Sequence, residues 1–185
     1  LRLAAAELRM GLVETRVGLI PGAGGCLEMV RKFGADIEPG FQLIFEGQFS
    51  DNAYEAQQRG LLAAGDRITL RKDALPAAIA WARERAAVDY LPPNPASLCV
   101  AGASGIERLE TWLEDQERTG QITTYDRTVG RSVARVLCGG ESHAGQLAEQ
   151  ELLDLEREEF LKLCGHEETR QRIEHMLNTG KPLRN

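Results

Sequence analysis

Apolar positions recur at helical spacing through the second half of the chain. Four stretches carry apolar side chains three or four positions apart and end at or near a glycine; they are residues 104–120, 123–140, 149–165 and 167–180. This spacing puts one apolar stripe along each helix. The pattern therefore predicts a mostly helical region over residues 97–185.

The first half of the chain mixes short apolar runs with short helical patterns. Residues 17–20 form a compact apolar run closed by Pro21, which is typical of a buried strand. Three or four short strands are too few for a complete sheet, so the missing neighbours are expected upstream of Leu1. Three helices are expected here: one at 26–34, one capped by Ser50 or Asp51 and ended at Gly60, and one at 73–87. Extended segments are expected at 2–10 and 66–70.

The clearest boundary lies where three of the four positions 92–95 are proline. Proline disfavours helical backbone in the residue before it, so this run is expected to be an extended linker. The sequence thus predicts three consecutive parts: residues 1–91, a linker at 92–96, and the helical region 97–185.

Composition and charge narrow the class of protein. The 185 residues carry a net charge of -6, which argues against nucleic acid as a partner. No apolar run reaches the roughly 18 residues of a membrane span. The four cysteines are far apart and form no CxxC pair, which is typical of reduced thiols and predicts a cytoplasmic protein. No two of His143, His166 and His175 form an i,i+4 pair, and no Cys/His cluster has zinc spacing, so no metal site is predicted.

A glycine-rich turn follows the apolar run, in the string ETRVGLIPGAGGC at residues 14–26. It lacks the Gly-Lys-Ser/Thr of a phosphate loop, and Leu27 stands where a dinucleotide fingerprint needs Gly or Ala. What remains is a turn before a helix N-terminus, where free backbone N–H groups favour partial negative charge. The glycines then serve either a close approach to a ligand or a tight turn with positive φ. Glu14 by itself is most simply a solvated turn carboxylate.

The wider string resembles a known family. Residues 13–34, VETRVGLIPGAGGCLEMVRKFG, resemble the signature of the crotonase (enoyl-CoA hydratase/isomerase) superfamily, and residues 45–68 resemble its next segment. Residues 147–185 resemble the C-terminus of fused enzymes in which a 3-hydroxyacyl-CoA dehydrogenase precedes a crotonase domain. The resemblance implies an α/β fold: residues 1–91 as the second half of a crotonase domain with few short strands, followed by the helical region.

The resemblance also implies roles for individual residues. Glu14 matches the second catalytic glutamate of hydratases, and Gly22 matches the glycine whose N–H helps hold the catalytic water. Pro21 and Gly24, in the same turn, are expected to line the substrate site. Cys26 departs from the usual threonine; it is expected to be a small helix-start residue, with a reactive thiol as the alternative.

The basic end of the chain, at Lys181 and Arg184, could contact coenzyme A phosphates or form a solvated tail. The sequence leaves the two open.

The expected activity is hydration of 2-enoyl-CoA in fatty-acid β-oxidation. The parent protein would also carry an NAD-dependent dehydrogenase domain upstream, and no cofactor is expected in this segment. Two alternatives remain: another crotonase reaction such as enoyl-CoA isomerisation, or a helical docking module without activity of its own. The expected partners are an acyl-CoA thioester, the upstream dehydrogenase domain and further copies of the protein.

Overall fold

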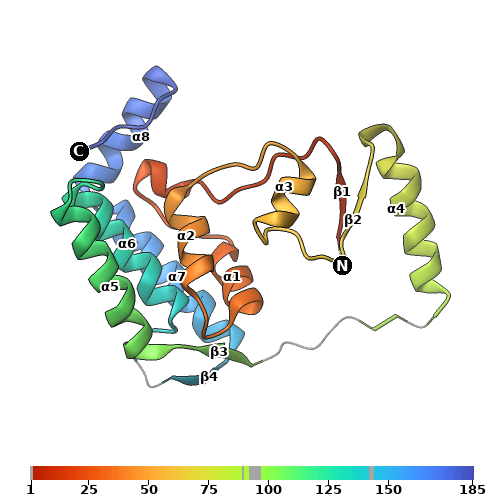
Figure 1. Ribbon diagram of the computed structural model, residues 1–185, viewed down its shortest axis with the longest axis horizontal. Helices are drawn as coiled ribbons and strands as arrows, with labels where there is room; N and C mark the ends of the chain where they lie inside the picture. Colours follow the sequence, from red (N-terminus) through yellow and green to blue (C-terminus); the bar gives the residue numbers. More distant parts are fainter. Residues whose placement is uncertain (1, 89, 92–96, 142–143) are drawn as a thin grey trace. The chain divides into compact units, whose positions relative to one another are not determined.

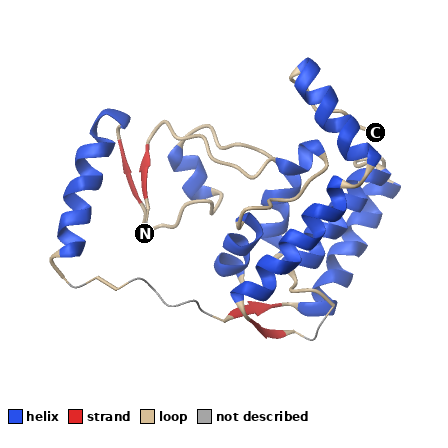
Figure 2. Cartoon of the chain, turned by 180° about the vertical axis from the view of Figure 1, so that it is seen from behind, coloured by secondary structure: helices blue, strands red, loops and turns tan. Residues whose placement is uncertain are grey.

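The computed structural model describes residues 2–88, 90–91, 97–141 and 144–185. The chain forms two compact units, one made of Leu1–Gly11 with Phe49–Pro95 and the other of Leu12–Gln48 with Ala96–Asn185. Figure 1 labels the elements of both units, and Figure 2 shows them from behind. The units are not consecutive in sequence, in contrast to the predicted division, and the linker predicted at 92–96 lies outside the described residues.

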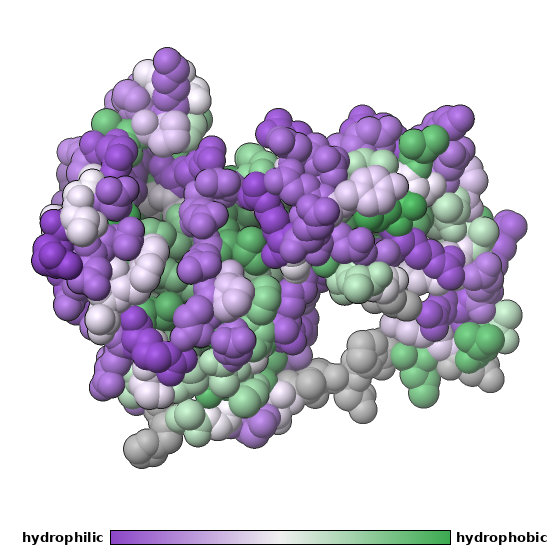
Figure 3. Space-filling model, in the orientation of Figure 1, coloured by the Kyte–Doolittle hydropathy of each residue, from purple (hydrophilic) through white to green (hydrophobic). Residues whose placement is uncertain are grey.

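The smaller unit contains two short strands in a parallel pair. β1 (Leu3–Ala5) pairs with β2 (Arg67–Thr69), and Ala4 stands opposite Ile68. Helix α3 (Ala53–Gln58) and helix α4 (Arg71–Ala86) complete the unit. None of the α4 side chains is buried, and hydrophobic residues appear at the surface around this helix (Figure 3).

The start of α3 differs from the prediction. Its capping residue is Asn52, whose Oδ1 accepts a hydrogen bond from the Glu55 N–H at 2.9 Å. The predicted alternatives have other partners: the Ser50 hydroxyl accepts from the Met10 N–H at 3.0 Å, and the Asp51 N–H donates to Glu55. Ser50 therefore ties two distant segments together instead of beginning the helix.

The larger unit is an array of helices. Its central helix is α6 (Thr124–Leu137), which packs against four others. It begins with a threonine cap, in which Thr123 and Asp126 exchange hydrogen bonds in a capping box. The helices around it are α1 (Gly25–Phe33), α2 (Glu38–Glu46), α5 (Gly102–Arg118) and α7 (Glu149–Cys164). Two short antiparallel strands, β3 (Leu98–Val100) and β4 (Gly145–Leu147), close one end of the array.

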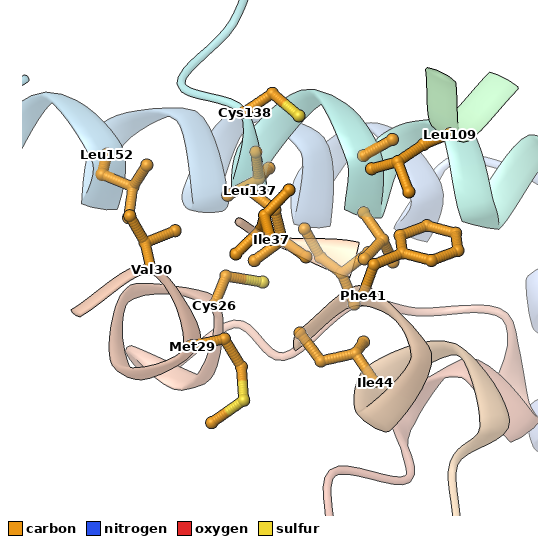
Figure 4. Packing of buried hydrophobic residues seen from close by; sticks show 14 of the residues in the cluster. Cys26, Met29, Val30, Ile37, Phe41, Ile44, Leu109, Leu137, Cys138 and Leu152 are labelled. Carbon is orange, nitrogen blue, oxygen red and sulfur yellow. The ribbon is translucent and has the colours of Figure 1, made fainter. Parts of the chain in front are cut away.

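One cluster of buried apolar side chains forms the core of this unit. Val30 of α1 and Phe41 and Ile44 of α2 face Leu137 of α6 and Leu109 of α5 (Figure 4). The stripes predicted for residues 104–120 and 123–140 supply much of this core, which confirms the helical pattern in that region. Helix α2 was not predicted from the sequence.

The last helix, α8 (Glu167–Thr179), is anchored by a buried arginine. Arg172 pairs with Asp126 at 2.8 Å, donates from Nε to the Asn185 side chain at 2.7 Å, and stacks on the Tyr125 ring. A buried guanidinium is tolerated only when it is paired in this way. The arginine thus holds both α8 and the end of the chain against α6.

The strand predicted at 17–20 is wrong. Residues Glu14–Val17 form a short 3₁₀ helix, η1, which ends at Gly18 with φ +79°. The Gly18 carbonyl accepts a hydrogen bond from the Thr169 hydroxyl at 2.8 Å, so the backbone bonds to α8 instead of to a strand. The apolar run is buried because it packs among helices, a case that periodicity cannot separate from a buried strand.

The predicted fold class needs the same correction. The described part of the chain is mostly helical, and each of its strands has three residues in a two-stranded sheet. The expected α/β portion of a crotonase fold is therefore replaced by a predominantly helical structure. None of the helices in the described ranges combines the length and apolar character that a membrane crossing needs.

Gly130 tests how closely the helices of the larger unit approach. A Cβ at this position of α6 would lie 2.6 Å from Leu113 Cδ2 and 2.9 Å from Phe45 Cε2. Gly130→Val should therefore lower the free energy of unfolding in urea by about 2–3 kcal/mol through overpacking. Gly145→Val is the control, because its Cβ meets no atom within 4 Å. Equal effects of the two substitutions would contradict the close packing.

Candidate functional site

The glycine-rich turn lies directly before α1, and its glycines meet two demands. Gly24 adopts φ +87°, a left-handed conformation that glycine reaches without a Cβ penalty. A Cβ on Gly25 would lie 2.5 Å from Cβ of Pro21 and 3.1 Å from Cδ2 of Leu12. The segment therefore folds tightly on itself, and it packs against the residues that precede Glu14.

A carboxylate from a distant helix occupies the donors of this turn. Glu156 of α7 accepts hydrogen bonds from the N–H groups of Gly24 at 2.6 Å, Cys26 at 2.9 Å and Leu27 at 3.4 Å. Its side chain is only 2% exposed. The first N–H groups of a helix have no partners within the helix, and its dipole favours negative charge there. The chain thus supplies its own anion at this position.

One helical turn later on α7, the Phe160 ring lies against Gly22, which is otherwise exposed. A Cβ on Gly22 would lie 2.6 Å from Cδ2 of Phe160, so any side chain there would displace the ring. Glu156 and Phe160 are four residues apart and therefore share one face of α7. The predicted role of Gly22 in holding water is not tested by this contact, but its lack of a side chain is required by it.

Cys26 is fully buried at the start of α1. Its thiol donates to the Pro21 carbonyl at 3.6 Å. Burial raises the pKa of the Cys26 thiol well above its usual range, and the nearby charges of Glu156 and Glu14 raise it further. A thiol in this environment stays protonated, which disfavours the reactive-thiol alternative and agrees with a small helix-start residue.

Glu14 is the one carboxyl of this region with an unsatisfied oxygen. It is the first residue of η1. Its Oε2 is buried and has no hydrogen-bond partner among the described residues. A buried polar atom without a partner costs about 1–3 kcal/mol. Such an atom is unusual in native structures and is a signal of function or of a missing partner.

The two basic residues at the chain end are exposed but lie in different settings. Arg184 donates from Nη2 to the Gln121 carbonyl at 2.6 Å. It also lines a pocket of about 280 Å³ with Thr15 and Arg16 of η1. The Lys181 N–H donates to the Thr179 hydroxyl at 3.2 Å. The structure therefore brings Arg184, rather than Lys181, near the segment that carries Glu14.

Sequence reasoning missed Glu156. Residues 154–159, DLEREE, form a charge run of the kind that is typical of a solvated helix face, yet Glu156 and Glu159 are both buried. Glu156 lies four residues after Leu152 and seven before Leu163, so it falls on the apolar stripe of α7. This helical spacing from Leu152 and Leu163 was the sequence feature that could have indicated a buried Glu156.

Comparison with known proteins bears on the identity of the chain. No family model matches it. The chain is 35% identical over 194 residues to a protein of Bacillus subtilis (strain 168) called "Probable 3-hydroxyacyl-CoA dehydrogenase". The relative is a dehydrogenase by name. The match covers 98% of this chain but 24% of the relative, so the chain spans about a quarter of that protein's length.

This comparison corrects the expectation drawn from the family resemblance. The matched relative is named for dehydrogenation, not for hydration or isomerisation. The crotonase assignment and the enoyl-CoA hydratase activity inferred from it are therefore wrong. The dehydrogenase character expected of the parent protein agrees with the relative's name. A cytoplasmic location and self-association stay predictions.

The environment of Cys26 predicts the pattern of thiol labelling. Cys99 and Cys164 are exposed, whereas Cys26 and Cys138 are buried, and burial raises the pKa of Cys138 to about 12. Between pH 7 and 9, a maleimide should label the exposed pair quickly and leave the buried pair protected, as followed by peptide mass spectrometry. Rapid labelling of native Cys26 would contradict the closed turn.

The raised pKa of Cys26 also predicts how the free energy of unfolding depends on pH. The pKa of the Cys26 thiol in the folded protein lies above that of an unfolded thiol, which is about 8.5. Its contribution to stability is therefore present below that pH and declines as the pH rises towards the folded value.

Proposed function

We propose that this chain is part of an oxidoreductase that acts on 3-hydroxyacyl-CoA thioesters in fatty-acid metabolism, and that it contributes to binding the acyl-CoA. The observation that carries this proposal is the 35% identity to the Bacillus subtilis protein over nearly all of the chain. The activity belongs to the whole polypeptide, of which this chain corresponds to about a quarter in the relative.

The proposed contact with the substrate is made by Glu14. The donors of Gly24, Cys26 and Leu27 are already bound to Glu156, so a ligand gains nothing from them. The unpaired Glu14 Oε2 is an acceptor. It suits a ligand that donates a hydrogen bond, and a hydroxyl on the acyl chain is such a donor. In this proposal Glu14 receives the substrate hydroxyl.

The other predicted residues have supporting roles. Pro21, Gly22 and Gly24 shape the turn beside the acyl group, while the Gly24 N–H itself remains bound to Glu156. Arg184 contacts a phosphate of coenzyme A with guanidinium donors beyond the one bound to Gln121. Lys181 adds positive charge near the same end of the chain.

A nicotinamide dinucleotide is the cofactor proposed for the whole protein, but the turn of this chain does not fit it. Leu27 occupies the position where the fingerprint needs Gly or Ala. The buried Glu156 carboxylate already holds the helix N-terminus, where it would repel a pyrophosphate. Another part of the polypeptide is therefore proposed to bind the cofactor.

The test uses the full native polypeptide with a short 3-hydroxyacyl-CoA and NAD. NADH formation is followed by absorbance, and affinity for the acyl-CoA by calorimetry. Glu14→Gln should weaken acyl-CoA binding about 10- to 100-fold, since a hydrogen bond to a charged group contributes about 1.5–3 kcal/mol. Glu28→Gln is the control: this half-exposed carboxylate of α1 pairs with Arg31, and its loss should leave acyl-CoA affinity near the native value.

The outcomes separate the two parts of the proposal. Failure of the native protein to form NADH from any 3-hydroxyacyl-CoA would refute the class of activity. Normal affinity and turnover in Glu14→Gln would refute the role of Glu14 and leave the class of activity intact.

A further inference from the structure

Glu156 belongs to a helix that follows the glycine turn by about 130 residues in sequence, yet its carboxylate is the main partner of that turn. One oxygen accepts from Gly24, and the other accepts from Cys26 and Leu27. Its position on the buried face of α7 is fixed by Leu152 and Leu163, both fully buried in the core. The carboxylate is thus held rigidly from one side and bonded to the turn on the other.

The turn and Glu14 form one packed segment. The Leu19 N–H donates to the Glu14 carbonyl at 3.1 Å, and Leu12, two residues before Glu14, packs against Gly25. The Cys26 thiol is influenced electrostatically by both Glu14 and Glu156. A shift of the turn would therefore move the backbone that carries Glu14.

Removing the charge of Glu156 would loosen this arrangement for a specific reason. An ionised carboxylate offers acceptor sites on both oxygens, whereas the amide of glutamine accepts only at one. At least one donor of the turn would then face the amide nitrogen without a partner, which costs about 1–3 kcal/mol. Because glycine has many accessible conformations, Gly22, Gly24 and Gly25 would resist this reordering poorly.

We propose that Glu156 is a positioning residue for the acyl-CoA site. It fixes the glycine turn and thereby holds the unpaired oxygen of Glu14 in place. This inference rests on the proposed role of Glu14 in binding the acyl thioester. Glu156 itself does not touch the substrate, since its oxygens are bonded to the turn.

The chain offers a matched control on the same helix. Glu159 is also a buried carboxylate, 1% exposed, but it bonds to Ser132 at 2.6 Å and to Arg135 at 2.5 Å, away from the turn. Hydrogen bonds to Ser132 and Arg135 lower the pKa of Glu159 although burial opposes this. Glu159→Gln therefore measures the general effect of losing a buried carboxylate from α7.

The experiment compares Glu156→Gln, Glu156→Asp and Glu159→Gln in the full polypeptide. Hydrogen exchange is measured at the amides of Gly24, Cys26 and Leu27, together with the affinity for a 3-hydroxyacyl-CoA. In Glu156→Gln these amides should exchange at least about tenfold faster and affinity should fall about tenfold, as loss of one hydrogen bond to a charged group predicts. Glu156→Asp should change the exchange rates and the affinity less than Glu156→Gln does. Glu159→Gln should leave both quantities near the native values.

Two outcomes would overturn the inference. Unchanged exchange in Glu156→Gln would show that the carboxylate does not order the turn. Faster exchange with native affinity would show that the turn does not position the site. If Glu156→Gln fails to fold, the Glu156→Asp protein decides on the same two measurements. Absence of acyl-CoA binding by the native protein would instead refute the proposed function, and is recognised before any variant is compared.

Discussion

The larger unit depends on a buried carboxylate bound to the first N–H groups of a helix. Glu156 brings a negative charge into a site that is almost closed to water, and three backbone donors with the dipole of α1 stabilise it. An unpaired charge at this depth would be strongly destabilising. The contact therefore requires α7 and the glycine turn to be in place together, although they are far apart in sequence.

This contact also decides what the glycine turn can do. By sequence it resembles a place where a ligand anion meets a helix N-terminus. In the folded chain the anion is part of the protein, and the donors are no longer available. The two carboxyl groups near Cys26 thus differ: Glu156 is fully bonded, whereas Glu14 keeps one oxygen without a partner among the described residues. This difference is the reason that we propose Glu14, and not Glu156, as the contact with a ligand.

Periodicity predicted the helices of the second half because long amphipathic stripes have few other stable arrangements. The strand at 17–20 failed, since a four-residue apolar run is equally compatible with a strand and with a segment buried among helices. Helix α2 was not predicted from the sequence. In the structure its Gly40 lies close to Phe33 and Met29 of α1, a contact between helices that the sequence does not show. Residues 12–48 pack with the C-terminal helices, which no local pattern indicates.

The candidate site was predictable only in part. Glu14 and the glycines could be selected from the sequence, because a glycine-rich turn before a helix indicates either a tight turn or a close approach to a ligand. Glu156 did not, because a charge run is usually solvated and its true partner lies in a distant segment. The family resemblance pointed to coenzyme A thioesters and a dehydrogenase parent, but it also suggested a hydratase, which the named relative does not support.

The central claim is that Glu14 recognises a hydroxyl on the acyl chain. The most direct measurement compares the affinities of a 3-hydroxyacyl-CoA and of the same acyl-CoA without the hydroxyl, in the native protein and in Glu14→Gln. The native protein should prefer the hydroxylated ligand by about tenfold or more, and the variant should lose that preference. An equal preference in both proteins would contradict the claim.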